Sequence, residues 1–197
     1  MNLLNLFRKF EEKYRDLKVI NSEWYVINCG VFSNCKEVRV RNNNHEYNEE
    51  WYRARFVWSL VESNCYPNKN ICVEFSIPKG SEGAKSLRAD IVIFKDKKWK
   101  ESYDEWDKKS ALPEKLAQNM LIVAEAKDNP NKVESTITKQ MGEAMNSYIG
   151  EQIFGIYFDN SDNVLLFRKE GTNSIKRYNS EKIIDGENYF FRVISFN

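Results

Sequence analysis

The sequence predicts an α/β fold in which a central mixed β-sheet is flanked by helices. Apolar and polar residues alternate over 71–77, which indicates a β-strand. Short apolar runs containing β-branched residues at 87–94 and 121–127 are typical of buried strands. Apolar residues then recur at helical spacing over 133–148. A helix before three strands, followed by another helix and strand, is the order expected of an α/β sheet.

The N-terminal part adds a helix and two strands to this plan. Apolar residues at steps of three and four predict an amphipathic helix over 3–17. Strands are expected over 22–32 and 36–41. The charged side of the second strand, with Arg39 and Arg41, is either a solvated face or a surface that contacts phosphate. A helix over 48–64 begins after Asn48, which is a good N-cap.

The length of 197 residues favours a single domain. We divide it into an N-terminal extension (1–45), a core (46–170) and C-terminal strands (171–197, including 174–178 and 189–195). A charged segment at 95–119 interrupts the core and is expected to be partly helical. Its aromatic residues, Trp99, Tyr103 and Trp106, either fasten it to the core, which we favour, or stack on bases or on a neighbouring domain.

Composition excludes several classes of protein. Thirty basic and twenty-nine acidic residues give a net charge of +1, which argues against a protein that coats DNA non-specifically. The four cysteines (Cys29, Cys35, Cys65 and Cys72) match no zinc spacing and are expected to be free thiols. No apolar run approaches the roughly 20 residues of a membrane span. Charged residues follow Leu4 too soon for a signal peptide, so we expect a cytoplasmic protein without a membrane partner.

Ionisable residues in two of the apolar strands are the candidate chemistry. Glu125 and Lys127 lie two residues apart and therefore project from the same face of their strand. Asp90 lies opposite an expected apolar face of its own strand, formed by Leu87, Ala89, Ile91 and Ile93. Buried charges are costly unless they are paired or bind a metal. A structural salt bridge and a Mg²⁺ site, which suits carboxylate ligands, both explain them.

Asp90 followed by Glu125-Ala126-Lys127 resembles the signature of the PD-(D/E)xK nuclease superfamily, although no proline precedes Asp90. The segments 88–93 and 124–127 are similar to the N-terminal nuclease domain of type I restriction-enzyme R subunits. The resemblance covers about 46–170. It implies a restriction-endonuclease-like fold and a Mg²⁺-dependent endonuclease that hydrolyses DNA phosphodiesters, with Mn²⁺ as a substitute metal.

The same resemblance implies roles for individual residues. Asp90 and Glu125 would hold the metal with the carbonyl of Ala126, and Lys127 would stabilise charge on the phosphate or orient the attacking water.

Residues on the two flanking helices extend this site. Glu49, which is followed one turn later by Arg53, resembles an acidic residue of the family that can complete the metal site. Alternatively, its negative charge simply complements the dipole at the start of its helix. Gln140 would position the DNA backbone. The family often has a tyrosine one turn after this glutamine, whereas here Tyr148 comes two turns later. Glu74 is expected to be a structural acid near Asp90.

The sequence contains no phosphate-binding G-x-x-x-x-G-K-[S/T] loop, so any ATP-driven motor must be elsewhere. The implied partners are DNA and the motor, methyltransferase and specificity subunits of a restriction complex. An alternative is a catalytically silent nuclease fold that docks onto other subunits or binds DNA. RNA as the substrate also stays open, because nothing in the sequence reads a 2′-hydroxyl.

Overall fold

The computed structural model describes most of the core and part of both terminal regions. The residues described are 3–21, 23–25, 31–32, 37–64, 66–78, 86–108, 110–170 and 174–177. The expected strand at 189–195 and the residues Cys29, Cys35 and Cys65 lie outside them. Cys72 is buried and is not part of a disulfide bond, as expected.

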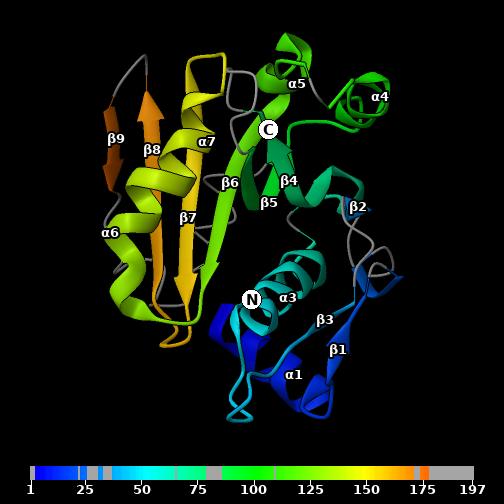
Figure 1. The fold of residues 1–197 in the computed structure, drawn as a ribbon, viewed down its shortest axis with the longest axis vertical. Coiled ribbons are helices and arrows are strands. Elements are labelled where there is room, and N and C mark those ends of the chain that lie inside the picture. The colour runs from blue at the N-terminus through cyan, green and yellow to red at the C-terminus, as the bar shows by residue number, and fades with distance from the viewer. Residues whose placement is uncertain are drawn as a thin grey trace.

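A mixed sheet forms the centre of the molecule (Figure 1). In the described residues it has seven strands in the order β2-β4-β5-β6-β7-β8-β9. Their bounds are β2 Val31–Phe32, β4 Ile71–Ile77, β5 Leu87–Phe94, β6 Met120–Lys127, β7 Gln152–Asp159, β8 Val164–Glu170 and β9 Ser174–Arg177. The pairs β2–β4 and β6–β7 are parallel and the other neighbours are antiparallel. The predicted α/β fold with a mixed sheet is confirmed.

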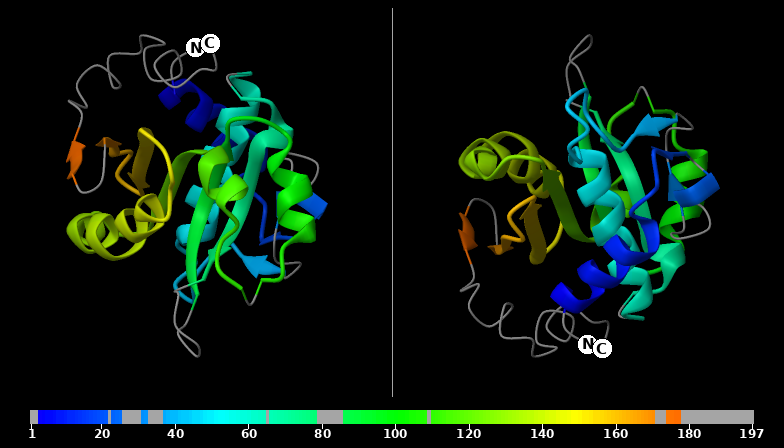
Figure 2. Two further views of the ribbon diagram at one scale, coloured as in Figure 1. Left: turned by 90° about the horizontal axis from the view of Figure 1, so that it is seen from above. Right: turned by 90° about the horizontal axis from the view of Figure 1, so that it is seen from below.

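A two-stranded sheet, β1 (Val19–Ile20) with β3 (Val38–Arg39), lies beside the N-terminal helix. Helices lie on both sides of the main sheet (Figure 2). They are α1 Leu3–Tyr14, α3 Glu49–Glu62, α4 Trp99–Glu105, α5 Glu114–Asn119, α6 Val133–Thr136 and α7 Gly142–Asn146, with short 3₁₀ turns at Asn68–Asn70 and Pro130–Lys132 and a π turn at Ile137–Met141. None of the helices described is long and apolar enough to cross a membrane.

The core consists of two hydrophobic clusters, one on each side of the sheet. The first joins α1 and α3 to one side of β6, formed by Ile122, Ala124 and Ala126. The second joins α4, α5 and α7 to the opposite side of the sheet. The small residues of β6 therefore allow α3 to approach closely. This approach brings the start of α3 beside the end of β6.

Helix α3 is held from both sides. Asn48 is its N-cap, and its side-chain oxygen accepts a hydrogen bond from the Glu50 amide at 3.1 Å. On the outer side Phe10 of α1 contacts Trp51 and Trp58, with ring centroids 4.9 and 5.9 Å apart. Because α1 covers one side and the sheet covers the other, residues around most of the helix circumference are buried. The buried surface of α3 is therefore wider than a single apolar face of an amphipathic helix.

The segment that connects β6 to β7 is helical from residue 130 to 146, as parallel neighbours require a long crossover. It contains the π turn Ile137–Met141, which the apolar spacing did not predict. Gly142 follows this turn, and a Cβ atom there would overlap with the carbonyl oxygen of Ile137. Gly155 of β7 likewise leaves room for Met141 and Met145, since a Cβ would lie 2.8 Å from both sulfur atoms.

The charged segment at 95–119 packs onto the core through its aromatic residues. The ring of Trp99 stacks on Phe94 of β5 at 4.3 Å, and its Nε1 donates a hydrogen bond to the Lys69 carbonyl at 3.0 Å. Trp99 and Trp106 are both buried in the second cluster. The interpretation that these aromatics fasten the segment to the core is confirmed.

Two local predictions were wrong. In the expected strand over 22–32, residues 31–32 do form β2. Residues 23–25 are helical instead, because Asn21 accepts a hydrogen bond from the Trp24 amide at 2.9 Å and starts a turn there. In β5 the expected single apolar face changes sides at Asp90. Leu87 and Ala89 belong to the second cluster, whereas Ile91 and Ile93 belong to the first.

The change of face occurs where Glu74 and Asp90 lie opposite each other, between the pairs Val73–Ile91 and Phe75–Ala89. Glu74 has a φ of 56°, which is the left-handed region that residues other than glycine rarely adopt. Such conformations cost about 1–3 kcal/mol and gather at functional sites. This distortion of the strand pair places both carboxylates on the side of α3.

Candidate active site

The candidate active site lies where β5 and β6 stop pairing through their backbones. The last backbone pair in this direction is Ile91–Ala124, and the next residues are Asp90 and Glu125. Here the side chains take over the hydrogen bonds of the sheet. The Ala126 amide donates to Asp90 Oδ2 at 2.9 Å, and the Asp90 amide lies 3.4 Å from Glu125 Oε1. Both carboxylates are thereby fixed between the two strands.

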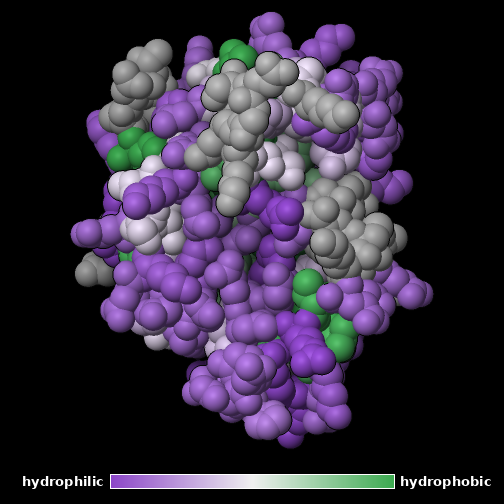
Figure 3. Space-filling model, in the orientation of Figure 1, coloured by the Kyte–Doolittle hydropathy of each residue, from purple (hydrophilic) through white to green (hydrophobic). Residues whose placement is uncertain are grey.

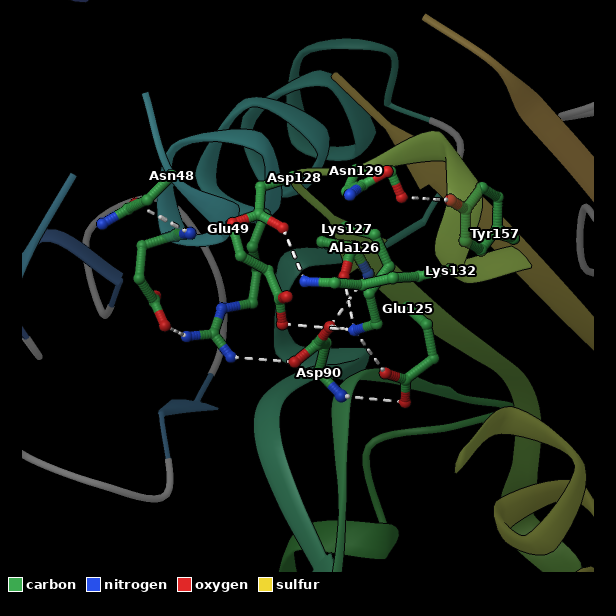
Figure 4. A network of polar contacts seen from close by, with 12 residues as sticks. Asn48, Glu49, Asp90, Glu125, Ala126, Lys127, Asp128, Asn129, Lys132 and Tyr157 are labelled. Atoms are coloured by element: carbon green, nitrogen blue, oxygen red, sulfur yellow. Dashed lines mark hydrogen bonds and ion pairs between the residues drawn. The ribbon is translucent and has the colours of Figure 1, made fainter. Parts of the chain in front are cut away.

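Four oxygen atoms surround the ammonium of Lys127 (Figure 4). Its Nζ donates to the Ala126 carbonyl at 2.6 Å and to Glu49 Oε1 at 3.2 Å. Glu125 Oε2 and Asp90 Oδ2 lie 3.5 and 3.6 Å from it. The predicted metal ligands, which come from α3, β5 and β6, therefore converge on one point. Glu49 belongs to this group as well as beginning its helix.

Arg53 anchors the other side of Asp90. The guanidinium is only 2% exposed. Its Nη1 lies 3.1 Å from Asp90 Oδ1, and its Nη2 lies 3.1 Å from Glu74 Oε1 and also contacts Glu50. Since Oδ2 of the same carboxylate accepts from Ala126, both oxygens of Asp90 are oriented. Glu74 also reaches Arg88 at 3.4 Å, so it supports the site as a structural acid near Asp90.

Burial strongly perturbs these groups. Glu125 is 1% exposed, and burial together with the nearby charge of Asp90 raises its pKa well above the ordinary value. The pKa of Glu49 is also raised, first by burial and then by Asp90. Burial lowers the pKa of Lys127, but the carboxylates of Asp90, Glu125 and Glu49 outweigh this and raise it overall. The ammonium therefore stays charged while Glu125 resists ionisation.

The ionisable residues of the cluster carry a net negative formal charge. Five carboxylates and three cations make up the network, namely Glu49, Glu50, Glu74, Asp90, Glu125, Arg53, Arg88 and Lys127. With all groups ionised, this leaves a formal charge of −2, and a proton on Glu125 reduces it to −1. Excess negative charge in a buried site is costly unless a cation compensates it.

The donor set fits magnesium in number and type. No group of three or more histidine, cysteine, aspartate or glutamate side chains within the described residues is arranged to hold a metal. Mg²⁺ does not need one, because it is usually held by one or two carboxylates and keeps several waters. Asp90, Glu125 and the Ala126 carbonyl are oxygen donors of this kind.

Gln140 and Tyr148 are not brought into this cluster by any contact. Gln140 is half-buried in the π turn and makes no hydrogen bond with Asp90, Glu125 or Lys127 in the described structure. Its role in positioning DNA remains a prediction. Tyr148 accepts a hydrogen bond from Lys95 at 2.9 Å, so its hydroxyl is engaged elsewhere.

Sequence reasoning did not find the contacts that Arg53 makes. Asp90 and Glu125 stand out because they interrupt apolar runs, but Arg53 lies on a helix with many charged residues. The available signal was the spacing of Glu50 and Arg53, which are three residues apart and so adjacent on a helix. That spacing predicts an ion pair and does not predict the contact with Asp90, 37 residues away.

Comparison with known families adds an independent finding. Residues 48–180 match the family described as Type I restriction enzyme R protein N terminus (HSDR_N). No significant match was found among curated proteins or among solved structures. The match includes α3, β5, β6 and the helical crossover, and thus every residue of the candidate site. The chain belongs to the family of type I restriction enzyme R protein N-terminal domains.

Proposed function

We propose that this protein is a Mg²⁺-dependent endonuclease domain that hydrolyses DNA phosphodiester bonds within a restriction system. The observation that carries the proposal is the convergence of Asp90, Glu125, Glu49 and the Ala126 carbonyl on the Lys127 ammonium. Structural ion pairs alone explain this arrangement less well, since each buried carboxylate must be desolvated for a net negative cluster.

Each residue has a distinct task in this mechanism. Asp90 and Glu125, with the Ala126 carbonyl and Glu49, would hold the metal. When bound, Mg²⁺ supplies a Lewis acid for the phosphoryl oxygen and lowers the pKa of a coordinated water. Arg53 and the Ala126 amide orient Asp90 before any ligand arrives, which limits reorganisation.

Lys127 is the positive group available to the scissile phosphate. Its ammonium retains its proton because three carboxylates face it, so it can stabilise the charge that grows on the phosphate oxygens. Gln140 would position the backbone. Base recognition and translocation must come from elsewhere, because the proposed residues contact only a phosphodiester.

Two substitutions test the mechanism. Lys127→Ala should keep metal binding but reduce cleavage by about a hundredfold or more, because one preorganised charge is lost. Asp90→Ala should lose both metal affinity and cleavage. Cleavage is measured on DNA in Mg²⁺ with the motor and specificity subunits present, and Mn²⁺ affinity is measured by calorimetry.

Circular dichroism in Mg²⁺ serves as the folding control for both variants, since Lys127 also balances buried carboxylates. Wild-type cleavage rates for Lys127→Ala would contradict the mechanism. Wild-type Mn²⁺ affinity for Asp90→Ala would contradict the metal site. The non-catalytic alternative, a docking or DNA-binding domain, predicts that neither variant changes cleavage by the assembled complex.

A further inference from the structure

The N-terminal segments form an open groove of ≈970 Å³ that is rich in basic side chains. We call it the basic groove and define it by Arg15, Lys18, Arg39 and Arg41. Asp16 is the one carboxylate among the described residues that line it. Arg15 and Lys18 follow α1, whereas Arg39 and Arg41 come from β3 and the residues after it. The fold therefore gathers four permanent positive charges from two separate segments.

Three of these charges are free to bind a ligand. Arg15, Lys18 and Arg39 are exposed, and no carboxylate within the described part of the chain forms an ion pair with them. Like charges held together in this way repel one another, and a polyanion relieves the repulsion.

Arg41 has a different role, because it builds the wall of the groove. Its Nη1 donates to the His45 carbonyl at 2.7 Å, and its Nη2 donates to the Tyr47 hydroxyl at 2.7 Å and to the Arg15 carbonyl at 3.2 Å. The guanidinium also lies 4.0 Å above the Tyr47 ring. These contacts tie the loop at 42–47 to the end of α1, so the groove is preformed.

The basic groove continues toward the candidate active site. Asn42 lines it and also lines a neighbouring hollow together with Asp128, Asn129 and Lys132, which directly follow the Lys127 strand. Asn48 Nδ2 donates to the Arg39 carbonyl at 2.6 Å, and the next residue is Glu49. Figure 4 shows Asn48, Asp128 and Asn129 around the residues that meet at Lys127. The lower end of the surface in Figure 3 is mostly hydrophilic, with a small hydrophobic patch at its right.

We propose that the basic groove binds the sugar–phosphate backbone of the DNA that enters the active site. The proposal rests on the proposed function, because it assumes a DNA substrate. It answers an electrostatic need, since the catalytic cluster is negative and the whole chain has a net charge of only +1. Every residue of the groove precedes residue 48, where the family match begins. The N-terminal extension would therefore supply a grip on DNA that lies outside the matched region.

The test compares two triple variants of the full chain. One removes the free charges of the groove (Arg15→Gln, Lys18→Gln and Arg39→Gln). The matched control removes three exposed lysines near α4 and α5, at the other end of the molecule in Figure 1 (Lys97→Gln, Lys98→Gln and Lys115→Gln). Both variants carry a net charge of −2 instead of +1, because each loses three positive charges.

Binding of a fluorescein-labelled DNA duplex is measured by fluorescence anisotropy without divalent ions, from about 50 to 200 mM salt. We expect the groove variant to bind roughly tenfold or more weakly than wild type, and its salt slope to fall by about 2.7, or 0.9 per lost phosphate contact. The control variant should keep most of the affinity and slope. Thermal unfolding of both variants confirms that the fold is retained.

Equal losses in the two triple variants would overturn the proposal, because net charge alone would then explain binding. Wild-type affinity and slope in the groove variant, or a wild-type chain that fails to bind DNA at low salt, would also overturn it. The outcome is separable from the proposed function. Loss of cleavage in Lys127→Ala with normal duplex binding concerns the active site alone. If the wild-type chain cleaves DNA normally and the groove variant binds the duplex as wild type does, only the groove proposal is refuted.

Discussion

Glu125 has the least water-accessible carboxylate of the candidate site, and its two oxygens have different partners. Oε1 faces the Asp90 amide and Oε2 faces the Lys127 ammonium. Burial and the charge of Asp90 raise its pKa, so the folded protein binds this proton more tightly than the unfolded chain. The stabilising effect of the proton is complete below the ordinary value of 4.5 and is lost as the pH rises through the raised pKa.

We therefore predict that stabilisation of the protein by Mg²⁺ grows as the pH rises through the raised pKa of Glu125. The reason is that a ligating carboxylate must be ionised, so metal binding releases the proton. Thermal unfolding with and without Mg²⁺ across the pH range measures the effect. Glu49 and Glu50 have raised pKa values and contribute with the same sign.

Glu125→Gln is the control for this linkage. It keeps the size of the side chain but cannot ionise, and the Mg²⁺-dependent shift should become small and flatter with pH. A shift in Tm that is equal at all pH values, or unchanged in Glu125→Gln, would contradict the assignment of Glu125 as a ligand.

At the scale of single elements, the π turn in the helical crossover affects how a nearby substitution changes the free energy of unfolding. In an ordinary helix interior, replacing glycine with alanine stabilises a protein by about 1 kcal/mol. At Gly142 the new Cβ would overlap with the Ile137 carbonyl of the π turn. We predict that Gly142→Ala instead destabilises by about 1–3 kcal/mol, as expected for overpacking.

Urea unfolding measures this change as a lower midpoint at constant m-value. Asn146→Ala is the matched control, because Asn146 is exposed on α7 and its replacement should change stability by less than about 0.5 kcal/mol. A stabilised Gly142→Ala protein would mean that the π turn relaxes to a regular α-helix without loss.

The elements differ in how far the sequence determines them. Alternation located β4, and apolar runs located β5 and β6, because side-chain period and burial act locally. The change of face at Asp90 depends on the left-handed backbone of Glu74, and nothing in its residue type signals that conformation. The π turn was missed for a similar reason, since its apolar residues keep helical spacing.

In the candidate site, too, local sequence patterns identify some residues, whereas contacts between distant parts of the chain cannot be predicted from them. Asp90, Glu125 and Lys127 could be chosen from the sequence because ionised side chains in apolar strands are costly to bury unless they are paired or bind a metal. The orientation of Asp90 by Arg53 requires a contact across the fold. Glu49 could be read equally well as a helix-start residue. Their roles in catalysis remain predictions, as do the divisions at residues 45 and 170.

For the whole molecule, α1 belongs to the hydrophobic core although it lies outside the residues that match the family. Phe10 is fully buried and contacts the rings of Tyr14, Trp24, Trp51 and Trp58. We predict that Phe10→Ala destabilises the protein by about 3–5 kcal/mol, the usual result of removing a large buried ring.

Denaturant unfolding of Phe10→Ala tests this prediction, with Lys9→Ala as the control, because Lys9 is the exposed neighbour on the same helix. Loss of less than about 1 kcal/mol in Phe10→Ala would mean that α1 is a dispensable attachment rather than part of the core. The expected large loss would place the N-terminal boundary of the folding unit before residue 10.

The contacts that close the candidate site also determine when it can first exist. Lys127 meets Glu49 across 78 residues of chain, and Asp90 meets Glu125 across 35. A fragment must span residues 49–127 to contain all these partners. Contacts between residues so far apart in the chain form late in folding, because the intervening loop must close first. A nascent chain would therefore bring the residues of the candidate site together only after β6 has been synthesised and has docked beside β5 and α3.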